Sequence, residues 1–339
     1  MEIECGRINW NIFFYLCDAH RILPAIYLQF ERHSLLEYIP VELQDYLANI
    51  YKLNKVRNEQ ILIQIHDITL LLNCQGISPI FLKGAAHLLD GLYEDNGERF
   101  MFDIDLIVST DDFQKTSQIL EEDGYFQLIP HRPENLLKEK HYPRLIKDGT
   151  IVGVEIHRML SEFDFSTYFH FGTIDKEKKV PIYALQECFV LSDKHKIIHH
   201  LINSQMSDNG FIYGRGDLRQ MNDFFLLSRK TDPVATLNEF RYFHRQTSAY
   251  LTLASRVYGI KKISGPFTIA SCFFVFRHDM SLRSQWWHDT SNIVLNIYRD
   301  HELQKVYIRN FKLALHNSSY RRERLRRLFN GTLFSDGIK

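Results

Sequence analysis

The sequence lacks the charge excess and the long apolar runs that mark several large protein classes. Lysine plus arginine and aspartate plus glutamate number 41 each, so the formal net charge is zero. A chain without excess positive charge has no long-range attraction to a phosphate backbone, which argues against a polynucleotide polymerase. No apolar run in the sequence approaches the roughly 20 residues that a membrane-spanning helix needs. We therefore expect neither nucleic acid nor a membrane as a partner.

Cysteine is scarce and scattered as well. The 339 residues contain five cysteines with no Cys-x-x-Cys spacing, which excludes a familiar zinc knuckle and gives no disulfide framework. The first residues, Met1 to Cys5, are acidic and do not resemble a secretory signal. We expect reduced thiols and a cytoplasmic protein.

The composition is otherwise that of an ordinary globular protein. Hydrophobic residues make up 45% and charged residues 24% of the chain, and its length suits one large or two modest domains. Aromatic residues are frequent at 13%, with 25 Phe and 17 Tyr. We interpret this excess as a large aromatic core, because buried aromatic side chains contribute much apolar area.

Two aspartates mark the segment that indicates chemistry. Asp103 and Asp105 alternate with Ile104 and Leu106 at the start of an apolar, β-branched run, which predicts a strand. Side chains two apart on a strand share a face, so the two acids should project together. Adjacent carboxylates repel unless a cation neutralises them, and hard oxygen ligands suit a divalent metal. We therefore predict metal binding, the alternative being a pair of exposed carboxylates.

A short glycine-containing segment precedes the acids. Lys83, Gly84 and Ala85 follow an apolar run, and glycine lets backbone N–H groups approach an anion closely. Lys83 suits a phosphate contact, and the alternatives are a solvated strand end or a structural ion pair with Asp103 or Asp105. Arg99 favours such an ion pair even more, because its fixed guanidinium matches a carboxylate.

Helical periodicity dominates the N-terminal part, and strands follow it. Apolar residues recur at helical spacing over 8–75, with a long helix from Val41 to Cys74 that stops at Gly76. Ser109 to Asp112 predicts a helix start, because a hydroxyl and acids favour the first turn. The predicted strands of this region are 80–82, 104–108 and 125–129.

A hairpin is expected further along. Residues 144–147 and 151–157 flank Asp148-Gly149, which favours a tight turn. In its second strand Glu155 shares a face with His157, opposite the apolar face. Glu155 would join the aspartates as a third acid if the strands are neighbours, whereas we expect His157 to play a supporting role.

The remainder returns to helical patterns, with helices predicted at 185–202 and 218–229 and more toward the C-terminus. His195 and His199 have a metal-compatible spacing, but without the usual glutamate we interpret them as packing residues. Arg219, near a glycine-rich bend, could reach a phosphate or could be solvated. The basic residues at 321–327 suggest a solvated helix face. We predict an α+β protein with a helical region at 1–76, a small mixed sheet at 77–180 and a helical region at 181–339.

Three of these segments together resemble the nucleotidyltransferase superfamily, and most of all its branch of uncharacterised nucleotidyltransferases. They are Leu82-Lys-Gly, the run from Arg99 to Val108, and Val154-Glu-Ile-His. The likeness extends back through a helical leader with Trp10 and forward to about residue 230. It implies a nucleotidyltransferase-like core that moves a nucleoside monophosphate from an NTP to a hydroxyl of a small-molecule or protein acceptor, releasing pyrophosphate.

The resemblance also implies site residues. Mg²⁺ or Mn²⁺ would be held by Asp103, Asp105 and Glu155, which are also the expected catalytic residues. ATP or another NTP would be bound by Lys83, Gly84, Ala85, Arg99 and Arg219. The superfamily usually has Gly-Gly or Gly-Ser where this chain has Gly84-Ala85. Two alternatives stay open: a nucleotide- or protein-binding module without turnover, and a DxD sugar-nucleotide transferase.

Overall fold

The computed structural model describes residues 8–127, 140–161, 165–260 and 268–284, with isolated residues between 286 and 295. The chain divides into two compact units, residues 1–211 with 215–275 and residues 212–214 with 276–339. The sheet and the candidate site below belong to the first unit. The C-terminal basic residues of the sequence analysis lie outside the described residues.

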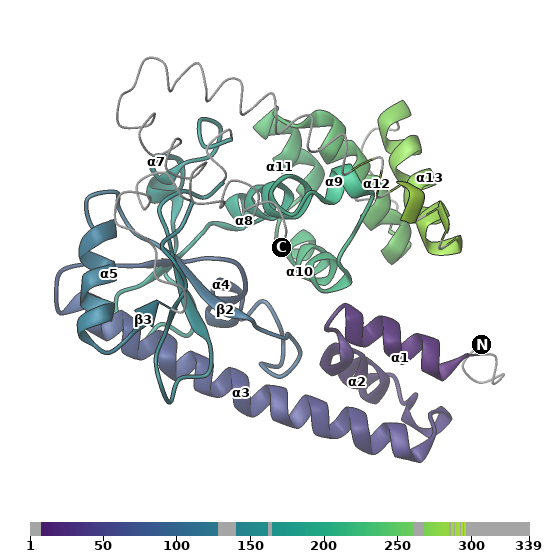
Figure 1. Cartoon of the computed structure of the whole chain (residues 1–339), viewed down its shortest axis with the longest axis horizontal. Coiled ribbons are helices and arrows are strands. Elements are labelled where there is room, and N and C mark those ends of the chain that lie inside the picture. Colours follow the sequence, from purple (N-terminus) through teal and green to yellow (C-terminus); the bar gives the residue numbers. More distant parts are fainter. Residues whose placement is uncertain are drawn as a thin grey trace, which may run out of the picture. The chain divides into compact units, whose positions relative to one another are not determined.

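Helices form the N-terminal region, as the periodicity predicted. They are α1 (Trp10–Ala19), α2 (Leu23–Arg32), a short 3₁₀ turn (Leu36–Tyr38) and α3 (Val41–Asn73), shown in purple and blue in Figure 1. Asn9 caps α1 by accepting the Ile12 N–H at 3.2 Å. Gly76, with a φ of +74°, allows the chain to turn after α3.

The long helix α3 contributes to two cores. Near its start, Leu47 is buried with Phe30 of α2, and further along Ile61 and Ile65 pack with the residues under the sheet. Figure 1 shows α3 extending past both regions. One helix of 33 residues thereby joins the N-terminal helices to the sheet.

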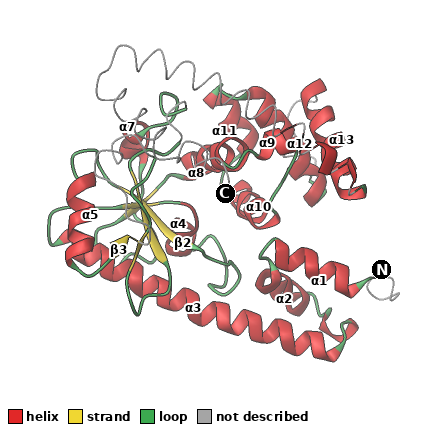
Figure 2. Cartoon of the chain, viewed as in Figure 1, coloured by secondary structure: helices red, strands yellow, loops and turns green. Residues whose placement is uncertain are grey.

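Six strands form one mixed sheet within the described residues. In the order β3-β4-β5-β2-β1-β6 they are β3 (Phe126–Gln127), β4 (Leu145–Ile146), β5 (Gly153–His157), β2 (Asp103–Ile107), β1 (Ile80–Phe81) and β6 (Phe189–Val190). β2–β5 and β1–β6 are parallel pairs and the other neighbours are antiparallel. Figure 2 shows the strands in yellow among helices, which confirms the predicted α+β class with a small mixed sheet.

The predicted hairpin is confirmed as the antiparallel pair β4–β5, with Leu145 opposite Val154. Gly149 adopts a φ of +79° in the connecting turn, a conformation that glycine reaches without steric cost. The strand predicted at 125–129 is described only up to Gln127, and its last residues lie outside the described part.

Helices cover the sheet and continue to the end of the described chain. They are α4 (Lys83–Leu89), α5 (Phe113–Glu122), α7 (Phe171–Ile174), a 3₁₀ turn (Asp175–Glu177), α8 (Asp193–Leu201), a π-helical segment (Ile202–Ser207), α9 (Gly210–Tyr213), α10 (Leu218–Lys230), α11 (Pro233–Phe240), α12 (His244–Tyr258) and α13 (Ile269–Arg283). The helix predicted at 218–229 is confirmed. Helix α5 begins at Phe113, directly after the predicted start. Ser109 forms hydrogen bonds with Asp112 in the turn before the helix, so it does not cap the helix directly.

The helix predicted at 185–202 is wrong in its first half. Phe189 and Val190 form the edge strand β6 beside β1, and α8 begins only at Asp193, where Ser192 caps it. The Phe189 N–H donates to the Pro79 carbonyl at 2.9 Å, so sheet pairing outweighs the local helical pattern. A strand of two residues is too short to leave a periodic signal in the sequence.

Candidate active site

The parallel pairing of β2 and β5 brings the predicted acids together. Asp105 lies opposite Glu155 in the register, and Asp103 lies opposite Gly153. The alternating residues Ile104 and Val154 are fully buried in the core beneath. The polar faces of both strands therefore point the same way, because parallel neighbours in register keep their alternation in phase.

Asp105, Glu155 and His157 form the tightest group. Each offers one ligand atom, and these atoms lie within 4.8 Å of one another. His157 Nε2 lies 2.6 Å from Asp105 Oδ1 and 3.9 Å from Glu155 Oε2. If Nε2 donates to Asp105, Nδ1 carries the lone pair, and Nδ1 has no hydrogen-bond partner among the described residues. Asp103 shares the face of Asp105 but lies outside this group, whereas His157, expected in a supporting role, belongs to it.

Lys83 pairs with the same aspartate. Its Nζ lies 2.6 Å from Asp105 Oδ1, the oxygen that His157 also contacts. Of the alternatives considered for Lys83, the structure therefore shows the ion pair. The residue opens α4 with a φ of +46°, an uncommon conformation for a side chain other than glycine.

The carboxylates carry more negative charge than Lys83 alone can neutralise. Burial, and then the charges of Asp105 and Glu155, raise the pKa of Asp103 to about 7. Burial would also raise the pKa of Asp105, but Lys83 and the hydrogen bond with His157 hold it well below its usual value. Burial lowers the pKa of His157 to about 4, so this imidazole is neutral near pH 7.

This donor set fits a divalent cation. Carboxylate oxygens are the ligands that Mg²⁺ and Mn²⁺ prefer, and the neutral His157 imidazole is a competent metal ligand in the tautomer that leaves Nε2, the nitrogen facing the carboxylates, unprotonated. A cation among these groups would relieve the repulsion that raises the pKa of Asp103. Asp105, Glu155 and His157, with Asp103 on the same face of β2, are therefore the residues that could hold a metal.

Gly84 and Ala85 have packing roles. A Cβ on Gly84 would collide with the Arg99 guanidinium and the Met101 sulfur, so only glycine leaves room for them. The Ala85 side chain is fully buried in the core beneath the sheet. Gly84 nonetheless lines the cavity beside the acids, whereas Ala85 is not among the lining residues.

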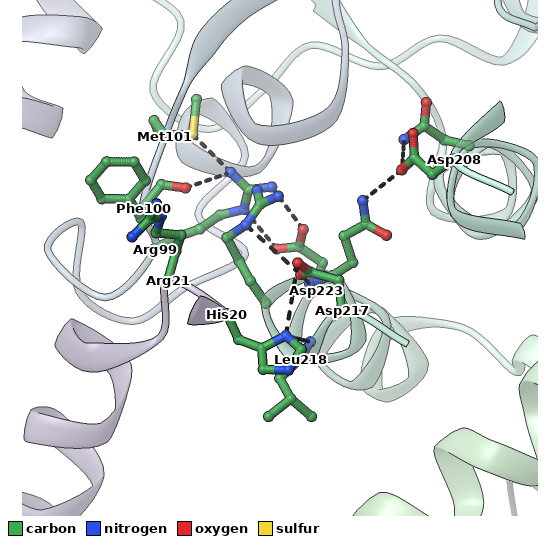
Figure 3. Close-up of polar contacts among 12 residues, drawn as sticks. His20, Arg21, Arg99, Phe100, Met101, Asp208, Asp217, Leu218 and Asp223 are labelled. Carbon is green, nitrogen blue, oxygen red and sulfur yellow. Dashed lines mark hydrogen bonds and ion pairs between the residues drawn. The ribbon is translucent and has the colours of Figure 1, made fainter. Parts of the chain in front are cut away.

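Arg99 does not pair with the aspartates of β2, so that prediction is wrong. Its Nε and Nη2 donate to the two oxygens of Asp223 on α10 at 2.7 and 2.8 Å, as Figure 3 shows. The Tyr93 hydroxyl donates to Asp223 Oδ1 at 2.5 Å. Asn58 holds the Arg99 carbonyl at 2.7 Å, which fixes the approach of the chain to β2. Burial would raise the pKa of Asp223, but the Arg99 charge holds it well below its usual value.

One cavity connects the two charged groups. Its lining includes Lys83, Asp103 and Asp105 from the sheet side and Arg219 and Asp223 from α10. His87, Phe102, Lys196, His199, His200, Asn203 and Gln220 also line it. The cavity thus joins the two aspartates of β2 to a wall made by α8 and α10, whereas Glu155 and His157 are not among its lining residues.

The start of α10 is anchored to the N-terminal helices. His20 Nδ1 accepts the Leu218 N–H at 3.2 Å and lies 4.0 Å from Asp217 Oδ2, as Figure 3 shows. Asp217 caps α10 by accepting the Gln220 N–H at 2.8 Å. Arg219, predicted to bind nucleotide, follows this cap with its guanidinium over the Phe102 ring, 5.1 Å from the ring centre.

Sequence reasoning missed several contacts of this region. The partnership of Asp223 with Arg99 and Tyr93 spans more than a hundred residues, so no local pattern reveals it. A weak signal existed, because Asp223 sits between the buried Met221 and Phe224 of an amphipathic helix. A charged residue at a buried helical position indicates a buried partner.

Comparison with protein families identifies the chain. Residues 6–253 match the family model described as uncharacterised nucleotidyltransferase, which covers more than half of the sequence. The chain therefore belongs to this family, as the three sequence segments suggested. No curated protein matches it. Within the described residues, every helix is too short or too polar to cross a membrane.

Proposed function

We propose that this member of the nucleotidyltransferase family is a divalent-metal-dependent enzyme that moves a nucleoside monophosphate from an NTP to a hydroxyl acceptor. The observation that carries the proposal is the cluster of Asp105, Glu155 and His157 on two parallel strands. The family supplies the general reaction class. The acceptor would be a small molecule or a protein, and the balanced charge of the chain disfavours nucleic acid. Its scattered thiols suit the cytoplasm, where we place the protein.

Asp105, Glu155 and Asp103 would hold Mg²⁺ or Mn²⁺ through carboxylate oxygens. Bound there, the metal would neutralise charge that develops on the phosphates. His157 and Lys83 position Asp105 through contacts of 2.6 Å to its Oδ1. Because burial keeps His157 uncharged near pH 7, it orients the carboxylate without adding a second positive charge.

The reaction itself requires little covalent chemistry from the protein. The acceptor oxygen attacks the α-phosphorus, the bond from that phosphorus to the bridging oxygen breaks, and pyrophosphate leaves. The proton of the acceptor hydroxyl would pass to a carboxylate, for which Glu155 is suited because it remains 18% exposed. Positioning of the reactants in the cavity supplies much of the remaining rate.

The nucleotide would occupy the cavity beside the acids. Lys83, Gly84, Arg99 and Arg219 line it and were predicted to bind nucleotide. Lys83 and Arg99 are already paired with Asp105 and Asp223, so they would contribute mainly by shaping the site. Ala85, buried in the core, would support the helix that carries Gly84.

A product search tests the proposal. The protein is incubated with Mg²⁺, each of the four NTPs and a cell extract, and mass spectrometry searches for molecules that gain a nucleoside monophosphate. We expect modified products and pyrophosphate with the wild type but not with Asp105→Asn. Products that form equally with both proteins would show that the acid cluster does not catalyse transfer.

The Lys83–Asp105 ion pair favours a second candidate, a binding module without turnover. The Lys83 ammonium lies 2.6 Å from Asp105 Oδ1 and already places one positive charge beside a residue that would hold a metal. Thermal unfolding separates the candidates, because a ligand that binds the folded state raises the melting temperature. Protection by an NTP with Mg²⁺ but no product favours the module. Protection by a nucleotide sugar and not by NTPs favours a sugar-nucleotide transferase.

A further inference from the structure

The cationic side chains that line the cavity differ in whether they are already paired. Lys83 lies 2.6 Å from Asp105, Arg99 lies 2.7 Å from Asp223, and Lys196 lies 2.5 Å from Asp90. Among the described lining residues, Arg219 is the exception, since the ion pair between its Nε and Asp217 Oδ1 is long, at 4.0 Å. Three cations are therefore engaged in short ion pairs, and the fourth retains donors for a ligand.

Arg219 is also held in a fixed orientation. Its guanidinium lies over the Phe102 ring, and the side chain is only 15% exposed. Its Nε is buried and has no hydrogen-bond partner among the described residues. A planar guanidinium stacked on an aromatic ring presents a rigid fork of donors, which matches phosphate oxygens.

His199 supplies a second unpaired group on the same wall. The residue is 3% exposed, lines the cavity from α8, and its Nε2 has no partner among the described residues. A buried polar atom without a partner costs free energy, so native proteins usually satisfy it with protein, water or a ligand. The packing role expected for His199 explains its burial but not the unpaired nitrogen.

The chain after His199 departs from a regular helix. A π-helical segment (Ile202–Ser207) follows α8, and Asn203 within it lines the cavity beside Arg219 and Gln220. Such π-helical turns occur frequently at functional sites. The turn at Lys83-Gly84, by contrast, has its lysine paired and the space beside the glycine filled by Arg99 and Met101.

We propose that Arg219 and His199 form a polyphosphate subsite on the helical wall of the cavity. The ligand class is the polyphosphate group of a nucleoside triphosphate or the pyrophosphate product. Arg219 donates through its fork, and His199 donates through Nε2–H to another phosphate oxygen. The inference rests on the proposed function and moves phosphate recognition from the Lys83-Gly84 turn to α8 and α10.

Calorimetric titration of the full chain with inorganic pyrophosphate and Mg²⁺ tests the subsite. Arg219→Gln should weaken binding about 10- to 100-fold, as expected for a lost charge-assisted contact, and His199→Gln should weaken it about 3- to 10-fold. Arg229→Gln is the matched control. It lies on the same helix α10 and stacks on Phe225 with its guanidinium 4.6 Å from the ring centre, but it does not line the cavity.

Affinity within twofold of the wild type in both Arg219→Gln and His199→Gln would overturn the subsite. So would variants that keep pyrophosphate affinity but lose affinity for the free nucleosides, since the wall would then contact the base. If His199→Gln fails to fold, the affinity of Arg219→Gln alone tests the subsite. The Arg219 side chain is partly exposed, and the substitution to Gln buries no new charge. Weakened pyrophosphate binding without any transferred product would uphold the subsite and reject the proposed enzyme.

Discussion

Two buried aspartates of the same cavity, Asp105 and Asp223, each pair with a cation but differ in the other charges around them. They are 1% and 3% exposed, respectively. Both oxygens of Asp223 accept hydrogen bonds from Arg99, and Oδ1 also accepts one from Tyr93. The single negative charge of Asp223 is therefore neutralised by a single positive charge. Asp105 receives Lys83 and His157 on a single oxygen.

The difference separates a structural pair from a candidate ligand site. A bidentate pair with every oxygen satisfied has little capacity for a further ligand, and it joins α10 to the segment before β2. Asp105 lies beside Asp103 and Glu155, and burial together with the negative charges of Asp105 and Glu155 raises the pKa of Asp103 to about 7. Uncompensated charge of this kind is costly for a fold and suits a site that receives a cation.

The largest expected effect is the loss of activity when an aspartate of the Asp103, Asp105 and Glu155 group is replaced. Asp105→Asn should lower nucleotide transfer by at least about 10²- to 10³-fold, the loss typical when a group that stabilises transition-state charge is removed. Asp103→Asn should act in the same direction. Product formation with Mg²⁺ and the best NTP measures both. Near-native turnover in either variant under saturating Mg²⁺ would remove that residue from the site.

The Arg99–Asp223 ion pair should matter more for stability than for activity. Asp223→Asn leaves the Arg99 charge buried without its partner, so the free energy of unfolding should fall by about 3–5 kcal/mol. Asp105→Asn should cost less, because Asp103 and Glu155 remain near Lys83. Urea unfolding of both variants measures the difference. An equal or greater loss in Asp105→Asn would contradict the contrast between the two aspartates.

Gly84 tests whether packing or ligand approach selects the glycine. Gly84→Ala should destabilise the unliganded protein by about 1–3 kcal/mol, because the new methyl group overlaps Arg99 and Met101. Gly172→Ala in α7 is the control, since its Cβ would meet only His170 at 3.3 Å. Thermal unfolding of the two variants compares them. Unchanged stability in Gly84→Ala would indicate that ligand approach, and not packing, requires a glycine at this position.

A smaller effect should appear in the pH dependence of stability. The folded state lowers the pKa of Asp223, so its contribution is present above the ordinary aspartate pKa near 4 and is lost as the pH falls through the folded-state value. The free energy of unfolding should therefore fall less steeply below about pH 4 in Asp223→Asn than in the wild type. Equal acid slopes in urea titrations would argue against this linkage.

Local patterns predicted much of the fold and part of the site. The helix that became α3, the hairpin around Gly149 and the face that each acid takes on its own strand follow from periodicity and turn chemistry, which act over a few residues. That β2 and β5 are neighbours was only a condition of the prediction for Glu155, because strand pairing is a long-range contact. Strand β6 did not follow, because two residues carry too little periodicity.

Long-range contacts explain the remaining errors. Arg99 was assigned to the nearby aspartates, yet its partner Asp223 is 124 residues away and reaches it only through the packing of α10. The packing reason for Gly84 depends on that same arginine, so it was equally hidden. The unpaired nitrogen of His199 is a property of the folded environment and has no sequence signature.

Direct metal titration tests the central claim, that the Asp105 cluster binds a divalent cation whereas the Asp223 pair is structural. Mn²⁺ binding is followed by electron paramagnetic resonance in the wild type, Asp105→Asn and Tyr93→Phe, the last of which removes one contact to Asp223. We predict that the wild type and Tyr93→Phe bind Mn²⁺ with equal affinity and that Asp105→Asn loses binding. Mn²⁺ binding that is unchanged in Asp105→Asn would contradict the assignment.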